Sequence, residues 1–249
     1  MRLLVTNDDG YLALGIRTLA RAAETLGTVD VIAPDREQSA TSHSLTLHHP
    51  LRVRLAQGGA RVIDGTPTDC VILAAGELLE AKPDLVLSGI NHGPNLGDDV
   101  LYSGTVAAAM EATILGIPAI ALSYAGSDYE SIEAWESVIA RLLERIVTRG
   151  DFPAETLLNV NLPPIHPDDL RGVRVTTLGR RAYVDSLTRG LDPNGREYFW
   201  IGGGSTRWWG GENSDFRAVE SGWISVTPLH LDLTNHALMR EISDWGLTL

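Results

Sequence analysis

The sequence predicts an α/β protein with a doubly wound, mostly parallel sheet and a β-rich appendage at its C-terminal end. Up to about residue 125, short apolar runs alternate with stretches of helical periodicity, a pattern typical of a Rossmann-like sheet covered by helices. After about residue 165 the helical period is lost, and glycine and tryptophan become frequent. We therefore expect a core over residues 1–165 and an appendage over residues 166–249, which either caps the site or pairs with another subunit.

The first elements are expected to form a βαβ unit. Residues 2–7 are strand-forming, residues 12–26 repeat apolar side chains at helical spacing, and residues 29–35 predict a second strand. Gly27 follows the helical pattern and marks its end. A right-handed crossover to a parallel neighbour is the expected connection.

The same alternation continues through the middle of the chain. Residues 84–91 predict a buried strand that ends in a glycine-rich loop. Residues 104–123 predict a helix of small residues, a turn and another buried strand. An amphipathic helix is expected at 131–147 and a further strand at 157–163.

The C-terminal region has a different composition. Four of the six tryptophans lie there, and residues 222–234 predict a strand that runs into extended chain. Two interpretations of the tryptophans, Trp200, Trp208, Trp209 and Trp223, remain open. They form an internal satellite core under a long hairpin, or they contact another subunit, because aromatic side chains are enriched at interfaces.

Composition narrows the class of protein. At 249 residues and 44% apolar content, the chain suits one large domain or a domain with an appendage. No apolar run reaches the roughly 18 residues that span a bilayer, the start does not resemble a signal peptide, and a net charge of −12 disfavours binding to duplex nucleic acid. The single cysteine, Cys70, is expected to pack in the core and favours a cytoplasmic location.

Polar loops follow several of the predicted strands. Ligands of open α/β sheets bind outside the carboxyl ends of the strands, so residues 7–10, 35–44, 65–69 and 88–105 are expected to converge there. The adjacent carboxylates of Asp8 and Asp9 repel each other unless a cation lies beside them. Mg²⁺ and Mn²⁺ prefer such oxygen ligands. The alternative is that these aspartates cap the first helix.

Three further features of these loops admit more than one role. Ser103, Gly104 and Thr105 precede an alanine-rich helix and predict either an anion site at its N-terminus or a plain helix cap. His43 and His92 are interpreted as proton donors or phosphate ligands, or as solvated or structural residues.

Five ordered motifs resemble those of the SurE family of stationary-phase survival proteins, which are metal-dependent 5′/3′-nucleotidases. The motifs are VTNDDG (5–10), APDREQSATSHSLT (33–46), GTPTDCV (65–71), SGINHGPNLGDDVLYSGTVAAAMEA (88–112) and ISVTPL (224–229). The resemblance implies a Rossmann-like core, hydrolysis of nucleoside 5′- or 3′-monophosphates to nucleoside and phosphate, and a C-terminal region used in forming a homodimer or homotetramer.

The resemblance also implies roles for single residues. The family's ligands to one divalent cation, Mg²⁺ or Mn²⁺, fall on Asp8, Asp9, Ser39 and Asn91. The phosphate-facing residues fall on Asn95, Ser103, Gly104 and Thr105, and the catalytic residues on Asp8, Asp9 and Asn95. The chain has His92 where other members carry arginine, which leaves open whether a fixed positive charge is needed there.

Two other functions remain as alternatives. A haloacid-dehalogenase-like phosphatase would form an aspartyl phosphate, but that chemistry is associated with an Asp-x-Asp spacing, and here the aspartates are adjacent. A nucleotide sensor without catalysis could use the same fold, although the density of oxygen ligands argues against it.

Overall fold

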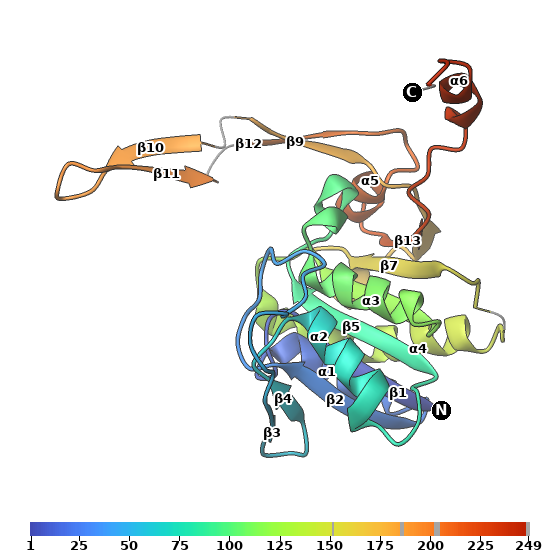
Figure 1. Ribbon diagram of the computed structural model, residues 1–249. Helices are drawn as coiled ribbons and strands as arrows, with labels where there is room; N and C mark the ends of the chain where they lie inside the picture. Colours follow the sequence, from blue (N-terminus) through green and yellow to red (C-terminus); the bar gives the residue numbers. More distant parts are fainter. Residues whose placement is uncertain (151, 185–186, 202–204, 248–249) are drawn as a thin grey trace.

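A computed structural model describes residues 1–150, 152–184, 187–201 and 205–247. Its centre is a nine-stranded sheet in the order β3-β4-β2-β1-β5-β6-β7-β13-β8 (Figure 1). The strands are β1 (Arg2–Thr6), β2 (Thr28–Pro34), β3 (Val53–Leu55), β4 (Arg61–Ile63), β5 (Leu85–His92), β6 (Ala119–Tyr124), β7 (Thr156–Leu162), β8 (Val173–Val175) and β13 (Ile224–His230). The six strands from β4 to β7 in this order are parallel, which confirms the predicted doubly wound α/β class.

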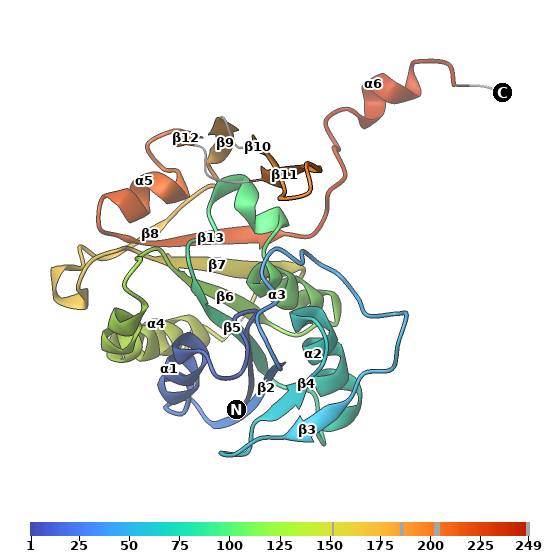
Figure 2. The same ribbon diagram turned by 90° about the vertical axis from the view of Figure 1, so that its left-hand side faces the viewer.

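Helices cover both faces of this sheet. One face carries α1 (Leu14–Ala23) and α4 (Glu136–Val147), and the other carries α2 (Pro67–Leu73) and α3 (Gly104–Ile114) (Figure 2). Strand β1 shows why two cores form, because its side chains alternate between faces. Leu3 and Val5 belong to the core under α1 and α4, whereas Leu4 belongs to the core under α2 and α3.

The amphipathic helix expected at 131–147 is divided in two. Its first part belongs to a 3₁₀ helix, η3 (Tyr129–Trp135), and the α-helix begins at Glu136. Trp135 is fully buried at the junction. The remaining short elements are the π-helix η1 (Ala74–Leu78) and the 3₁₀ helices η2 (Gly97–Leu101) and η4 (Pro167–Asp169). None of the helices in the described ranges is long and apolar enough to span a bilayer.

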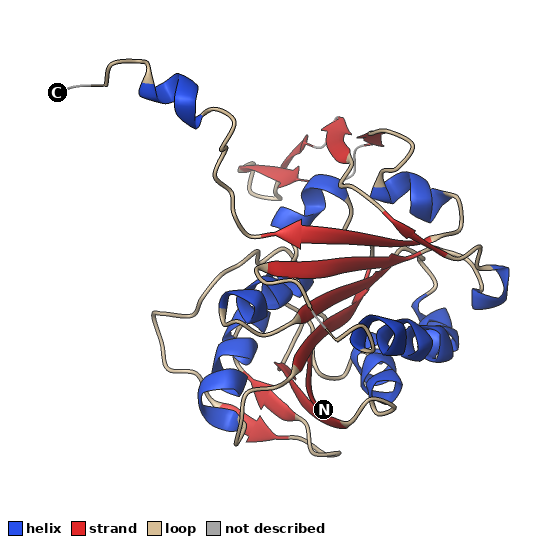
Figure 3. Ribbon diagram, turned by 90° about the vertical axis from the view of Figure 1, so that its right-hand side faces the viewer, coloured by secondary structure: helices blue, strands red, loops and turns tan. Residues whose placement is uncertain are grey.

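The C-terminal region divides between the sheet and two projections. Strand β13 pairs antiparallel with β7 and parallel with β8, so both of these late strands extend the central sheet. Between them, β9 (Arg180–Val184) pairs with β12 (Ser205–Trp209), and β10 (Leu187–Leu191) pairs with β11 (Glu197–Ile201), which forms a long arm (Figure 1). After α5 (Asp215–Glu220) and β13, the chain leaves the body and ends beyond α6 (Met239–Ser243) (Figure 3).

The four C-terminal tryptophans divide between the two interpretations. Trp208 stacks on Phe216 with ring centroids 5.4 Å apart and packs on a small cluster with Leu96 and Val219. The guanidinium groups of Arg171 and Arg174 lie over the ring of Trp223, 5.7 and 4.3 Å from its centroid. Trp200 and Trp209 are 67% and 50% exposed, so, among the described residues, the satellite core includes Trp208 alone of the four.

A close approach between α1 and β5 ties the fold to the predicted site. A Cβ atom on Gly15 would lie 2.0 Å from the carbonyl oxygen of Ile90, which directly precedes Asn91. We expect Gly15→Ala to lower the free energy of unfolding by about 3 kcal/mol, because the added methyl group overpacks this contact. The control is Gly76→Ala in η1, where no atom lies within 4 Å. Denaturant unfolding checks both variants, and equal midpoints would contradict the prediction.

Candidate functional site

The site lies where the order of the strands reverses. From β1 the chain proceeds to β2 on one side, whereas β5, β6 and β7 extend the sheet on the other side. The crevice at such a switch point is where ligands bind in doubly wound folds. Asp8 and Asp9 follow β1, and Asn91 lies near the end of β5, its neighbour. Strand order therefore brings the predicted ligands of two separate motifs together.

Asp8 is held by the first turn of α3. The backbone N–H of Thr105 donates to its Oδ2 at 3.1 Å, and the Thr105 hydroxyl donates to its Oδ1. A Cβ atom on Gly104 would lie 2.9 Å from the Cβ of Asp8, so glycine is required for this approach. The predicted anion site at the helix start thus holds the carboxylate of Asp8, which the helix dipole favours.

Burial dominates the electrostatics of both carboxylates. It raises the pKa of Asp8 to about 6, an effect that the hydrogen bonds from Thr105 oppose and the charge of Asp9 increases. It also raises the pKa of Asp9 to about 6, against the hydrogen bond from the His92 N–H at 3.0 Å and with a further increase from Glu37. The alternative that these aspartates cap the first helix is wrong, because Ala13 occupies the N-cap of α1.

His92 does not supply a fixed positive charge. Burial lowers the pKa of its imidazole, against the charges of Asp8 and Glu37, so the ring is mostly neutral at pH 7. The ring stacks on Tyr129 with centroids 4.5 Å apart, and its Nδ1 lies 4.0 Å from Oδ1 of Asp9. His92 therefore contributes its backbone N–H and a flat packing surface to the site.

Ser39 reaches the site on a loop without regular structure between β2 and β3. It lines the same cavity as Asp8, and the loop is joined to Asp8 by a 2.7 Å hydrogen bond from the Gln38 N–H to the Asp8 carbonyl. The Ser39 hydroxyl donates to Glu37 at 2.6 Å, which leaves its lone pairs to bind a cation. The sequence analysis missed Glu37, although this acid lies only two residues before the predicted ligand.

The segment 65–69 has a supporting role. Thr66 and Asp69 form a capping box at the N-terminus of α2. Asp69 also accepts hydrogen bonds from the backbone and hydroxyl of Thr46, at 3.0 and 2.6 Å. This motif thus fastens the far end of the loop that carries Ser39. Cys70 is fully buried behind it, as expected for a core residue, and burial raises the pKa of its thiol.

The predicted ligands fit a hard divalent cation. Nδ2 of Asn91 donates to the Gly93 carbonyl at 2.8 Å, which assigns Oδ1 as its ligand atom. Within the described ranges, no three His, Cys, Asp or Glu side chains gather in a way that could hold a metal. A cation here would therefore depend on two carboxylates supplemented by neutral oxygens, a ligand set that suits Mg²⁺ or Mn²⁺ better than zinc.

Asn95 is fixed by a network that the sequence analysis did not anticipate. Its carbonyl accepts from Nδ2 of Asn159 and of Asn161, at 2.8 and 3.0 Å. Its N–H donates to Oδ1 of Asn161 at 2.8 Å, and its own Nδ2 donates to the Ser123 hydroxyl at 2.8 Å. The only signal in the sequence was the pair of asparagines, two residues apart, on one face of an otherwise apolar strand.

The side chains of the site surround an open cavity of about 520 Å³. Asp8, Ser39, Asn95 and Ser103 line it together with Ala40, Pro94, Asp99, Tyr102 and Ile201. The Ser103 hydroxyl caps α3 by accepting the Val106 N–H at 3.1 Å, which confirms the cap interpretation. Asp9, Asn91, Gly104 and Thr105 are not among these lining residues, and the phosphate-facing role of Gly104 and Thr105 stays a prediction.

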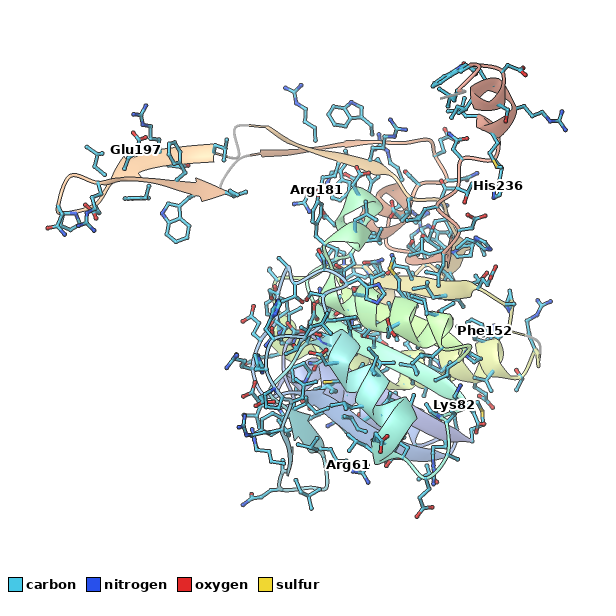
Figure 4. The ribbon with its side chains drawn as sticks, in the orientation of Figure 1. Arg61, Lys82, Phe152, Arg181, Glu197 and His236 are labelled. Atoms are coloured by element: carbon cyan, nitrogen blue, oxygen red, sulfur yellow. The ribbon has the colours of Figure 1, made fainter. Side chains whose placement is uncertain are left out.

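The arm is anchored at the cavity edge. Arg181 lies at the base of the arm (Figure 4). It forms an ion pair with Asp99 and stacks over Trp208, and its N–H donates to Asp98 at 2.8 Å. The buried carboxylate of Asp215 accepts from the N–H groups of Gly97 and Gly179 at 2.7 and 2.8 Å. The loop that contains η2 is thus held by α5 and by the arm.

An α/β sheet whose switch point carries the motifs with Asp8, Asp9 and Asn91 is typical of the SurE family. The sequence profile of the family described as Survival protein SurE matches residues 3–185. The chain belongs to the SurE family, which confirms the resemblance seen in its motifs.

Individual relatives match over nearly their whole length. The chain is 60% identical over 249 residues to a protein named 5′-nucleotidase SurE from Gemmatimonas aurantiaca, and the alignment covers 98% of each chain. It is 51% identical to a protein of the same name from Geobacter sulfurreducens, over 100% of this chain and 95% of the relative. The crystal structure of the SurE protein from Aquifex aeolicus superposes with a TM-score of 0.87 at 44% identity, covering 98% of this chain and 99% of that one.

The raised pKa values predict that the metal-free protein loses stability between mild acid and neutral pH. An aspartate in an unfolded chain titrates near pH 3.9, whereas Asp8 and Asp9 titrate at about 6 in the folded protein. Between these values the folded state binds more protons, so the free energy of unfolding falls as pH rises. We expect Asp9→Asn to raise the free energy of unfolding by about 1–3 kcal/mol at pH 7 and to change it little at pH 4.

The measurement is the free energy of unfolding of chelator-treated protein, determined at pH 4 and at pH 7. Asp169→Asn is the control, because Asp169 is an exposed aspartate. An equal gain for Asp9→Asn at pH 4 and pH 7 would show that the ionisation of Asp9 is not the cause.

Proposed function

We propose that this chain hydrolyses nucleoside 5′-monophosphates, with 3′-monophosphates as alternative substrates, to nucleoside and phosphate. The relatives named 5′-nucleotidase SurE support this activity at up to 60% identity. The observation that carries the proposal is the adjacent pair of buried Asp8 and partly buried Asp9, next to a cavity of about 520 Å³. A cavity of this size suits a small organic ligand. The chain is thus a metal-dependent 5′-nucleotidase, a phosphomonoester hydrolase.

Asp8, Asp9, Ser39 and Asn91 would hold one divalent cation, Mg²⁺ or Mn²⁺. The geometry that supports this assignment is the shared switch point of β1 and β5, together with the free lone pairs of Ser39 and Asn91. When bound, the metal supplies a Lewis acid that neutralises phosphoryl charge and lowers the pKa of water.

Side chains of the cavity wall would bind the phosphoryl group. Ser103 accepts a hydrogen bond through Oγ, which leaves its O–H to donate. Asn95 uses one hydrogen of its amide on Ser123, and the second one is left for a phosphoryl oxygen. Because four hydrogen bonds fix Asn95 in place, it can stabilise developing charge without reorganisation.

Hydrolysis then requires a proton acceptor for the attacking water. The water oxygen bonds to phosphorus, the ester P–O bond breaks, and the leaving nucleoside oxygen takes up a proton from solvent. Asp8 or Asp9 accepts the proton of the water, since both carboxylates lie at the switch point beside the cavity. The buried free thiol of Cys70 takes no part, and as the only cysteine it favours the cytoplasm as the compartment.

We also propose that the protein is a homodimer or a tetramer built from dimers. The arm exposes a run of apolar side chains, Tyr198, Phe199, Trp200 and Ile201. The C-terminal segment exposes Leu233, Leu238, Met239, Ile242, Trp245 and Leu247. Both projections stand away from the body (Figures 1 and 3), and soluble monomers rarely expose apolar surface on this scale. A second copy of the chain would cover it.

Phosphate release from AMP tests the activity. We expect turnover with Mg²⁺ or Mn²⁺, none after chelation, and recovery when the metal is restored. Asp9→Asn is expected to lose at least about 100-fold in kcat/KM, comparable to removing one group that stabilises the transition state, whereas Asp169→Asn keeps full activity. Full turnover in a metal-free sample would refute the metal assignment, and a trapped phosphoenzyme would favour the aspartyl-phosphate mechanism.

Sedimentation at low micromolar concentration tests the assembly. We expect a mass of at least twice 26.9 kDa, and a smaller assembly with a lower melting temperature when residues 231–249 are deleted. Leu233 is 90% exposed in the C-terminal segment, and Leu233→Ser should weaken association. Leu12→Ser is the matched control, because Leu12 is 72% exposed on the body of the protein. A single monomeric species would refute the assembly.

A further inference from the structure

We propose that His43 and Glu111 form a positioning pair that holds the Ser39 loop, residues 35–52, in place for metal binding. The inference rests on the proposed function, because it assumes that Ser39 is a metal ligand. His43 Nε2 lies 2.7 Å from Oε2 of Glu111, which belongs to α3. Neither residue lines the cavity beside Asp8, so the pair acts through Ser39.

The Ser39 loop depends on outside contacts for its shape. Residues 35–52 contain no helix or strand, and loops of this length are uncommon in compact domains unless they serve a function. Ala40 and Ser42 have φ angles of 57° and 53°, in the left-handed region that side chains disfavour. Such conformations persist only where the surroundings hold them, and both residues are close to Ser39 in the chain.

The contact with Glu111 is well placed to hold the loop. Among the described residues, it is the first side-chain hydrogen bond after Ser39 that joins the loop to another element. The Glu111 residue is only 9% exposed, and the side chain of His43 is 32% exposed. Loss of the histidine would leave a mostly buried carboxyl without this partner, which costs free energy and therefore favours the bond.

Helix α3 connects this contact to the carboxylates. Its first turn fixes Asp8 through the N–H and hydroxyl of Thr105, and its third turn carries Glu111. One rigid helix therefore sets the position of Asp8 and, through His43, that of the loop with Ser39. Release of His43 would leave the loop near Ser39 held by the backbone bonds from Gln38 to Asp8 and from Ser42 to Tyr102, at 2.7 and 3.1 Å. We therefore expect a looser position of Ser39 relative to Asp8 while the helix and the sheet remain intact.

Mn²⁺ affinity, measured by electron paramagnetic resonance on the full-length protein without substrate, tests the pair. We expect His43→Ala and Glu111→Ala each to weaken Mn²⁺ binding about tenfold, as is typical for residues that orient metal ligands. The double variant should be no weaker than either single one, because both remove the same contact. Glu111→Gln keeps an acceptor for His43 and should stay within about twofold of the parent.

Hydrogen exchange of the metal-free protein gives a second readout that is independent of metal and of activity. In His43→Ala, the amides of residues 38–46 should exchange faster, while those of α3 keep their protection. His48→Ala is the matched control, since His48 is an exposed histidine of the same loop, and it should change neither exchange nor Mn²⁺ affinity.

The pattern across variants decides the outcome. A lower melting temperature with unchanged Mn²⁺ affinity in both His43→Ala and Glu111→Ala would assign the pair a purely structural role and overturn the proposal. Asp9→Asn separates this failure from that of the proposed function. If Asp9→Asn loses Mn²⁺ but His43→Ala does not, only the positioning role is wrong. If neither loses it, the metal site itself is wrong, and the positioning role with it.

Discussion

The contact between Asp8 and the first turn of α3 is the constraint on which the rest of the site depends. Burial disfavours the ionised carboxylate, and two donors from Thr105 offset part of that cost. The contact forms only because Gly104 has no side chain. It also fixes the position of α3, whose cap residue Ser103 lines the cavity and whose Glu111 meets the Ser39 loop.

The same contact changes how an acidic protein can attract an anionic substrate. The chain carries a net charge of −12, and the N-terminus of α3, a natural site for a phosphate, is already occupied by Asp8. Glu37 adds a further negative charge near Asp9, and His92 is mostly neutral because burial lowers its pKa. Binding of a phosphate therefore depends strongly on a cation held by these carboxylates, so metal and substrate affinity should be coupled.

Sequence patterns predicted the parts of the fold and site that depend on neighbours in the chain. Short apolar runs predicted the strands β1, β2, β5, β6 and β7. Asp8 and Asp9 were predicted as ligands because two adjacent carboxylates repel each other unless a cation lies beside them. The partners of Asn95 on β7 could not be predicted in this way, because Asn159 and Asn161 lie far along the chain and meet it only through strand pairing. The pairing of His43 with Glu111 likewise joins two motifs whose spacing carries no signal.

The end of β7 and the start of β13 lie side by side, since Asn161 pairs with Ser225 in antiparallel register. Within residues 163–223, which connect these two strands, β8 still pairs with β13 in the sheet. The strands of the arm pair with one another instead, so the arm is a loop segment outside the central sheet. The entropy of closing a loop rises only slowly with its length. During evolution this segment could therefore be lengthened, shortened or exchanged at little cost to the sheet, and chains that share the same catalytic core could acquire different outer architectures.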